Sequence, residues 1–249
     1  MTNLKWNIGC SGYHYADWKG KFYPEKLAKT KWFEYYTRFF KTLELNNTFY
    51  RFPRLENLEN WYNISPPEFT FAVKIPRAIT HYRKFNDCDR MLSDVYTAVE
   101  NGLKEKTGCL LFQLHPHTHY NEEKLKMMLN CMSSNFHNVL EFRHASWWNK
   151  TVYEMLAEKD VTFCSMSHPE LPDEVVINTK NVYYRFHGVP LLYRSSYSNK
   201  FMKHITNEIN TNDKVKNAFV YFNNDYDAVA VDNALKMKDI ALENLKVNK

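Results

Sequence analysis

Short apolar runs and longer amphipathic segments alternate along the whole chain. Eight runs of five to seven residues are rich in apolar and β-branched side chains and are bounded by polar or turn-forming residues, which is typical of buried strands. Successive runs start roughly 30 residues apart, the length of one strand-helix unit. The predicted strands cover residues 7–12, 42–46, 70–76, 109–115, 138–144, 161–167, 182–188 and 218–223.

Between these runs, apolar residues recur at intervals of three and four, the spacing that places them on one face of a helix. The clearest helical patterns cover residues 32–39, 92–103, 125–132, 201–209 and 230–241. Residues 55–64, 150–158 and 170–178 are expected to be helical as well, although these patterns are shorter or lie close to prolines.

Eight alternating units can close into a barrel or form an open, doubly wound sheet. The stretch CSGYHYADW after the first strand lacks the G-x-G-x-x-G spacing of a dinucleotide-binding turn. Nearly every strand ends in polar residues, whereas an open sheet would concentrate them at one crevice. We therefore predict an α/β fold, a TIM-type (β/α)8 barrel, with residues 1–249 forming a single domain of ordinary size for this fold.

Composition narrows the class of protein. Hydrophobic and charged residues make up 44% and 24% of the chain, and no run of about 18 apolar residues is present. The first ten residues, MTNLKWNIGC, contain no apolar stretch typical of a secretory signal. We therefore expect a cytoplasmic protein that does not associate with membranes, and the sequence indicates no oligomeric state.

Cysteines and net charge change this picture little. The five cysteines are widely spaced and contain no Cys-x-x-Cys pair, so they are expected to be reduced and mostly buried rather than disulfide-bonded or bound to zinc. The formal charge of +5 favours an anionic partner without requiring a nucleic acid.

Polar residues at the strand ends predict a functional site. Charged groups are costly to bury unless they are paired, so several charges converging at one end of the strands require an explanation. One explanation is a network of structural ion pairs, Glu141 with Arg143 or Arg185 and Glu44 with Lys74. We favour a site for the set as a whole, because a barrel that needs only stability fills its interior with branched aliphatic residues.

Two carboxylates are candidates for acid and base catalysis. A carboxylate near a cation stays ionised, and one in an aromatic pocket is shifted towards the neutral form, so Glu141 and Glu44 can take different roles. His187 is the next candidate for proton transfer. Lys74, Arg143 and Arg185 are suited to binding a phosphate, a carboxylate or a developing oxyanion.

A divalent metal is the competing chemistry, because several histidines and both carboxylates lie at or just past strand ends. Three cations in the same region would repel such an ion, so no cofactor is predicted and a divalent metal remains the less favoured alternative. His115, His117 and His119 alternate in QLHPHTHY, but this pattern is more typical of an exposed loop than of a metal site.

The segment PRAITHYRKF after the third strand interleaves basic and aromatic residues. This composition suits phosphates and stacked bases, although a short basic stretch is more often only a solvated rim.

Seven motifs in order, GCSGYHYADWKGKFYP, LELNNTFYRFP, FAVKIPRAITH, LLFQLHP, LEFRHASWW, YYRFHG and YFNND, give the chain a resemblance to the YecE-like family, domain of unknown function 72. The chain departs from the family pattern at His115, where the first of two prolines is usual, and in NNDYDAVAV, which lacks the usual glycines. The resemblance implies a TIM-type barrel, similar in outline to endonuclease IV and xylose isomerase-like enzymes, but no defined activity.

Motif positions and strand periodicity together select one set of residues. The expected catalytic residues are Glu141, Glu44, His187 and Lys74. The expected substrate-binding residues are Tyr13, Asn46, Tyr50, His81, Gln113, Arg143, Arg185, Asn223 and Asn224.

Three functions are compatible with this set. The leading hypothesis is an enzyme that uses carboxylate acid/base catalysis on a phosphate-bearing or otherwise anionic small substrate, a hydrolase, lyase or isomerase. The alternative is a protein that binds or processes nucleic acid, and the third hypothesis is a non-catalytic barrel that binds a metabolite or a partner protein.

Overall fold

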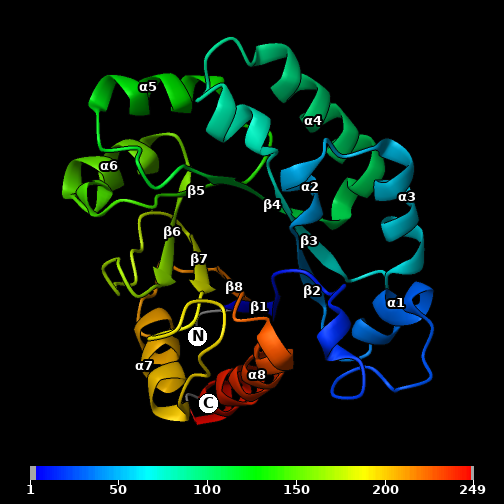
Figure 1. The fold of residues 1–249 in the computed structure, drawn as a ribbon. Coiled ribbons are helices and arrows are strands. Elements are labelled where there is room, and N and C mark those ends of the chain that lie inside the picture. The colour runs from blue at the N-terminus through cyan, green and yellow to red at the C-terminus, as the bar shows by residue number, and fades with distance from the viewer. Residues whose placement is uncertain (1–3, 248–249) are drawn as a thin grey trace. The chain divides into compact units, whose positions relative to one another are not determined.

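The computed structural model describes residues 4–247 and contains all eight predicted strands. Hydrogen-bonded neighbours follow the order β1-β8-β7-β6-β5-β4-β3-β2, which is the chain order of a (β/α)8 barrel (Figure 1). The predicted fold class is therefore confirmed. The strands are β1 Lys5–Cys10, β2 Thr42–Leu45, β3 Thr70–Lys74, β4 Thr107–Gln113, β5 Asn138–Glu141, β6 Thr162–Ser167, β7 Asn181–Phe186 and β8 Asn217–Phe222.

Helices occupy seven of the eight predicted helical segments. The main helices are α1 Trp32–Tyr36, α2 Asn47–Tyr50, α3 Leu55–Ile64, α4 Asp89–Leu103, α5 Glu122–Cys131, α6 Lys150–Glu158, α7 Asn199–Asn210 and α8 Val229–Val247. Single turns of other helix types are η1 Ala16–Trp18, η2 Lys29–Lys31, η3 Ala78–Tyr82, η4 Lys104–Lys106, η5 Ala145–Trp147 and η6 Tyr226–Ala228.

The predicted helix over residues 170–178 does not form, and this segment is irregular. Pro169 and Pro172 disfavour helical backbone at the residues that precede them, His168 and Leu171. The backbone N–H of Val176 instead donates to the Ser165 hydroxyl at 2.8 Å, which ties the segment to β6. The prediction was wrong here because this loop gains its hydrogen bonds from a strand rather than from itself.

Contacts divide the chain into two compact units, with boundaries inside β2 and β6. The first unit comprises the residues up to Leu43 and those from Ser165 onward, and the second unit comprises Glu44–Cys164. The prediction of a single domain stays a prediction.

In the second unit, β3, β4 and β5 are parallel neighbours, and helices α3 and α4 pack side by side (Figure 1). Gly102 allows this close approach, because a Cβ atom at that position would lie 2.5 Å from Cβ of Leu58. The Lys106 ammonium donates to the carbonyl oxygens of Tyr62 and Ser65 at 2.7 and 2.9 Å, where α3 ends. These contacts hold α3 at a fixed position against the strands.

In the first unit, β8 lies between β1 and β7, and all three strands are parallel. Aromatic side chains form much of its core, including the stacked pairs Tyr23 with Trp32 and Phe186 with Phe222, whose centroids lie 4.6 and 4.4 Å apart. The described helices include no segment with both the length and the apolar character required to cross a bilayer.

Candidate functional site

The strand ends of the second unit bring three of the predicted residues to one edge of the sheet. Lys74, Gln113 and Glu141 are the last residues of β3, β4 and β5. Gln113 is in register with Glu141 on the neighbouring strand. Because these strands are parallel, their carboxyl ends meet at the edge where an α/β protein builds its site.

Glu141 and Arg143 form a buried ion pair. Nη1 of Arg143 donates to Oε1 of Glu141 at 2.7 Å, and the side chains are 8% and 0% exposed. Residues two apart in an extended chain point to the same side, which explains why the two side chains meet. A charge-assisted hydrogen bond of this length favours the ionised carboxylate, so Glu141 is arranged as a base or as a charge stabiliser.

Lys74 is 8% exposed and lies against an aromatic ring. Its Nζ atom is 4.2 Å from the centroid of Phe49, within the range of a cation–π contact. The backbone carbonyl of Lys74 accepts a hydrogen bond from the Thr48 hydroxyl at 2.6 Å. The position of this ammonium therefore depends on the single turn of α2.

His81 lies in the π-helical turn η3, and its ring centroid is 5.1 Å from that of Phe49. The pKa of His81 is lowered from its ordinary 6.5 to about 4, chiefly by burial and also by the charges of His115 and Lys74, which outweigh the opposing charge of Glu141. The imidazole is therefore neutral near pH 7 and can accept a proton or donate a hydrogen bond. Short π-helical turns are often found at functional sites.

Glu44, Asn46 and Tyr50 differ in their surroundings. Glu44 is fully buried, and its charge adds to burial in raising the pKa of the Cys109 thiol. Within the described residues, the buried Oδ1 atom of Asn46 has no hydrogen-bond partner. Tyr50 is 65% exposed, and Cζ of Arg77 lies over its ring, 5.2 Å from the ring centroid. Tyr50 therefore lies at the solvent-exposed rim of the predicted site.

The first unit brings together three further predicted residues, Arg185, His187 and Asn223. Nη1 of Arg185 lies 3.3 Å from Nε2 of His187, and Nη2 of Arg185 donates to Oδ1 of Asn223 at 3.3 Å. Nη2 also donates to the Ser11 hydroxyl at 3.4 Å. Arg185 is 1% exposed, so this group is a buried polar cluster that can bind an anion or a hydroxyl group.

Two predicted residues make different contacts. Asn224 donates to the carbonyl of Ser195 and to Oδ1 of Asn233, both at 2.9 Å, so it anchors the start of α8. Its neighbour Asn223 instead contacts Arg185 and His187. The Tyr13 ring packs 5.2 Å from that of Phe33, among aromatic residues.

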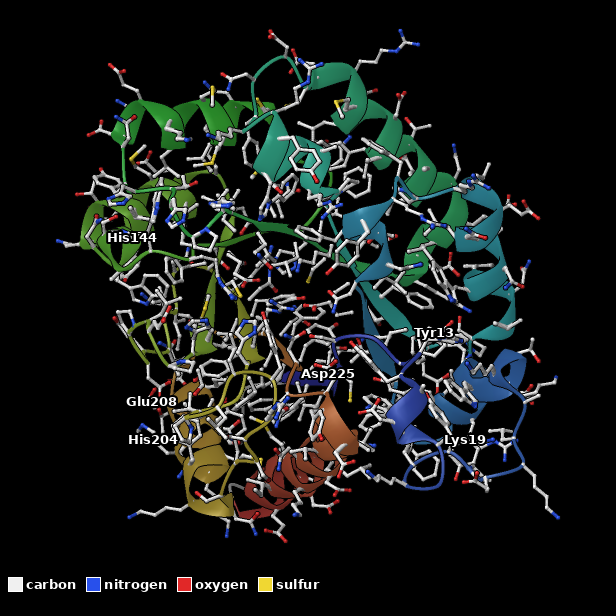
Figure 2. The ribbon with its side chains drawn as sticks, viewed as in Figure 1. Tyr13, Lys19, His144, His204, Glu208 and Asp225 are labelled. Carbon is white, nitrogen blue, oxygen red and sulfur yellow. The ribbon has the colours of Figure 1, made fainter. Side chains whose placement is uncertain are left out.

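Asp225 was not among the predicted residues. It lies between β8 and α8 (Figure 2), where burial raises its pKa, a hydrogen bond with Tyr15 and the charge of Arg185 lower it, and Asp17 raises it. The Tyr15 hydroxyl oxygen lies 2.6 Å from the Ser11 carbonyl oxygen. The YFNND motif contained this residue, but alternation gives no direction to a side chain beyond the strand.

Four histidines of the second unit lie in two small groups. The His119 and His144 rings stack at 3.8 Å, and His115 lies 5.5 Å from His81. Among the described residues, no three His, Cys, Asp or Glu side chains are arranged to hold a metal ion. The expectation that no cofactor is needed stays a prediction.

All five cysteines are free thiols, and four of them are buried. Their placement agrees with their interpretation as small apolar residues.

Two known proteins resemble this chain, one of them over nearly its full length. The UPF0759 protein YunF of Bacillus subtilis (strain 168) is 26% identical over 269 residues, covering 94% of this chain and 93% of YunF. The UPF0759 protein YecE of Escherichia coli (strain K12) is 26% identical over 152 residues, covering 60% of this chain and 53% of YecE.

Solved structures give the same result. A DUF72 family protein from Thermotoga maritima MSB8 has a TM-score of 0.85 and 27% identity, covering 96% of this chain and 99% of that protein. A second, from Enterococcus faecalis V583, has a TM-score of 0.81 at 16% identity, covering 95% of each chain, and shows the fold alone. The family model described as protein of unknown function DUF72 matches residues 7–248. This chain therefore belongs to the DUF72 family.

Proposed function

We propose that the protein is an enzyme that acts on a small phosphate-bearing or otherwise anionic substrate at the carboxyl ends of β3, β4 and β5. Glu141 transfers a proton and Lys74 binds the anion. The observation that carries this proposal is the buried Glu141–Arg143 pair at a strand end, on the same sheet edge as the nearly buried Lys74. Buried charges of both signs are costly unless they are used or fully paired.

The geometry favours a division of roles within this group. The contact with Arg143 keeps Glu141 ionised, which suits a general base. His81 is neutral at pH 7 and lies near Glu141 and Lys74, so it can donate a hydrogen bond to an oxygen that becomes negative. Lys74 supplies the point charge that holds a phosphate or carboxylate close to the base.

Glu44 and the Arg185 cluster extend the proposal. Glu44 is the second carboxylate available for proton transfer in the second unit. In the first unit, Arg185 and Asn223 are proposed to bind polar substrate groups, and His187 remains the proton-transfer candidate there.

The first test is a thermal-shift screen of the full chain against sugar phosphates, nucleotides, carboxylic acids and divalent metals, because a ligand that binds the native state raises its melting temperature. A hit other than a nucleotide is then examined with two variants and a control. Glu141→Gln should retain the shift but abolish turnover of that ligand, and Lys74→Met should lose the shift.

Lys126→Met is the matched control, because Lys126 is exposed on α5 and pairs with Glu122. It should behave like the unchanged chain. Full turnover by Glu141→Gln, or an undiminished shift in Lys74→Met, would reject the proposed roles.

A second candidate, nucleic-acid binding, has one specific observation in its favour. Arg77 lies between Tyr50 and Tyr82, 5.2 and 5.4 Å from their centroids, and these rings are 65% and 67% exposed. Exposed aromatic rings beside arginine are suited to stacking on bases. This function predicts oligonucleotide affinity that falls steeply with salt and weakens in Arg83→Gln/Lys84→Gln; binding that is insensitive to salt would count against it.

A further inference from the structure

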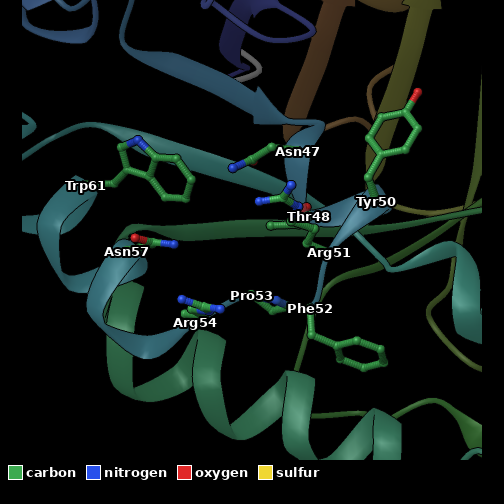
Figure 3. Close-up of a pocket in the computed structure, with 9 residues that line it drawn as sticks. All are labelled: Asn47, Thr48, Tyr50, Arg51, Phe52, Pro53, Arg54, Asn57 and Trp61. Atoms are coloured by element: carbon green, nitrogen blue, oxygen red, sulfur yellow. The ribbon is translucent and has the colours of Figure 1, made fainter. Parts of the chain in front are cut away.

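A hollow of ≈ 610 Å³ lies between α2 and α3, in the segment that follows β2 (Figure 3). Its volume is in the range of pockets that bind small molecules. Strand periodicity did not select this region, and only Tyr50 belongs to the predicted site. The lining residues are Asn47, Thr48, Tyr50, Arg51, Phe52, Pro53, Arg54, Asn57 and Trp61.

We propose that this hollow binds a phosphate monoester that carries a planar ring, of the class of nucleoside monophosphates. Arg51 and Arg54 hold the phosphate, and the ring lies against Trp61. The inference does not depend on the proposed enzymatic function, because it uses none of the residues that are given a role in that function.

The two arginines supply the anion-binding part. Neither guanidinium makes a hydrogen bond or an ion pair with the side chains described, which are those of residues 4–243, and no Asp or Glu is among the residues that line the hollow. Arg54 also directly precedes the first turn of α3, where backbone N–H groups and the helix dipole favour an anion. Two guanidinium groups and a helix start around one hollow create a local positive potential that a dianion would neutralise.

The opposite wall supplies a ring platform and polar groups for its edge. Asn57 and Trp61 are four residues apart on α3, so both face the same side of the helix. Trp61 is 9% exposed, which means that most of the indole is packed and only a small part of it borders the hollow. Figure 3 shows Asn57 and Asn47 directed towards the space between the helices, whereas Phe52 turns away from it.

The walls of this hollow are anchored before a ligand binds. The Thr48 hydroxyl lies 2.8 Å from the carbonyl of Leu45 and 2.6 Å from that of Lys74, which fixes α2. The far end of α3 is held by Lys106. A preformed pocket loses less conformational entropy on binding, which favours a small ligand.

This hollow differs from the group proposed for catalysis. Phe49 contacts Lys74 and His81, whereas its neighbours Thr48 and Tyr50 line the hollow. Neither Lys74 nor Glu141 belongs to the lining. Binding in the hollow should therefore survive the substitution Lys74→Met.

Isothermal titration calorimetry of the full chain with AMP, GMP, CMP and UMP tests the proposal. At least one nucleotide should bind, and the matching nucleoside, ribose 5-phosphate and inorganic phosphate should each bind at least about tenfold more weakly, since each lacks one set of contacts. Arg51→Gln/Arg54→Gln should weaken binding about tenfold or more, and Trp61→Leu should reduce it to the level of ribose 5-phosphate.

The matched control is Arg38→Gln/Arg90→Gln, which removes two exposed arginines outside the hollow and should leave the affinity unchanged. Circular dichroism and thermal melting establish that each variant is folded, and if Trp61→Leu does not fold, the arginine pair decides the test. Three results would overturn the proposal: no binding of any nucleotide at millimolar concentration, equal binding by Arg51→Gln/Arg54→Gln, or tighter binding of a 5′-phosphorylated pentanucleotide, which would assign the hollow to nucleic-acid ends.

Discussion

Replacing Arg143 by methionine tests whether the buried ion pair holds Glu141 in its charged form. The nitrogen and oxygen lie 2.7 Å apart, and Glu141 has no exposed side-chain surface. Removing one partner of a buried pair costs about 3–5 kcal/mol, because the other charge loses its compensation. For a chain of this size, one kcal/mol changes the melting temperature by about 2–4 °C, so Arg143→Met should lower it by roughly 6–20 °C at neutral pH.

Two further measurements separate charge from packing. Glu141→Gln/Arg143→Met removes both charges and should recover much of the loss, which a double-mutant cycle by urea denaturation quantifies. The deficit of Arg143→Met should also shrink as the pH is lowered, because protonation removes the uncompensated charge of the buried carboxylate. If Arg143→Met is within about 1 kcal/mol of the unchanged chain, or if the double variant is no more stable than Arg143→Met, Glu141 is not held by this contact.

Three other predictions concern titration. The pKa of His81 falls from its ordinary 6.5 to about 4 on folding, so the native state is not penalised by this residue above pH 6.5 and loses stability as the pH falls towards 4. His81→Gln should therefore make the urea midpoint depend less on pH over that range. An unchanged dependence of the midpoint on pH would contradict this assignment. The pKa of Asp225 is raised mainly by burial, so its contribution to the free energy of unfolding is complete at low pH and is lost as the pH rises. Thermal melts should therefore show that Asp225→Asn is more stable than the unchanged chain at pH 8 but not at pH 3. Burial raises the pKa of Cys88 to about 11 and also raises that of Cys10. Iodoacetamide should therefore modify both thiols slowly in the native chain and rapidly in urea. Fast labelling of the native chain, detected by peptide mass spectrometry, would contradict their burial.

The fold was predictable because eight strands carry strong apolar patterns and their spacing matches one architecture. The predicted bounds of α3 and α6, residues 55–64 and 150–158, agree with the observed helices. Most predicted strands extend one to three residues beyond the observed strand ends. Polar residues such as Arg143 continue the alternation after the hydrogen bonds between neighbouring strands have ended. The single turn α2 escaped detection, since four residues are too few to show a helical period.

Prediction of the site succeeded where side chains keep the two-residue alternation of the strands, including the first residue past a strand end. It failed further along the loops. Arg185, His187 and Asn223 follow the two-residue period and meet as expected, whereas Asn224 is one residue out of phase and faces α8. Asp225 follows the strand, where direction depends on the path of a loop. The arginine-lined hollow depends on how α2 and α3 turn relative to each other, which no local pattern encodes.

The Thr48 hydroxyl contacts the carbonyl of Leu45 at the end of β2 and that of Lys74 at the end of β3, while its own residue lines the hollow. A protein engineer who reshapes this hollow at α2 would therefore also move Lys74. Substitutions at residues 47–51 should be selected together, because α2 is a single turn. A displacement of α2 at the hollow would also displace the contacts that α2 makes with Lys74.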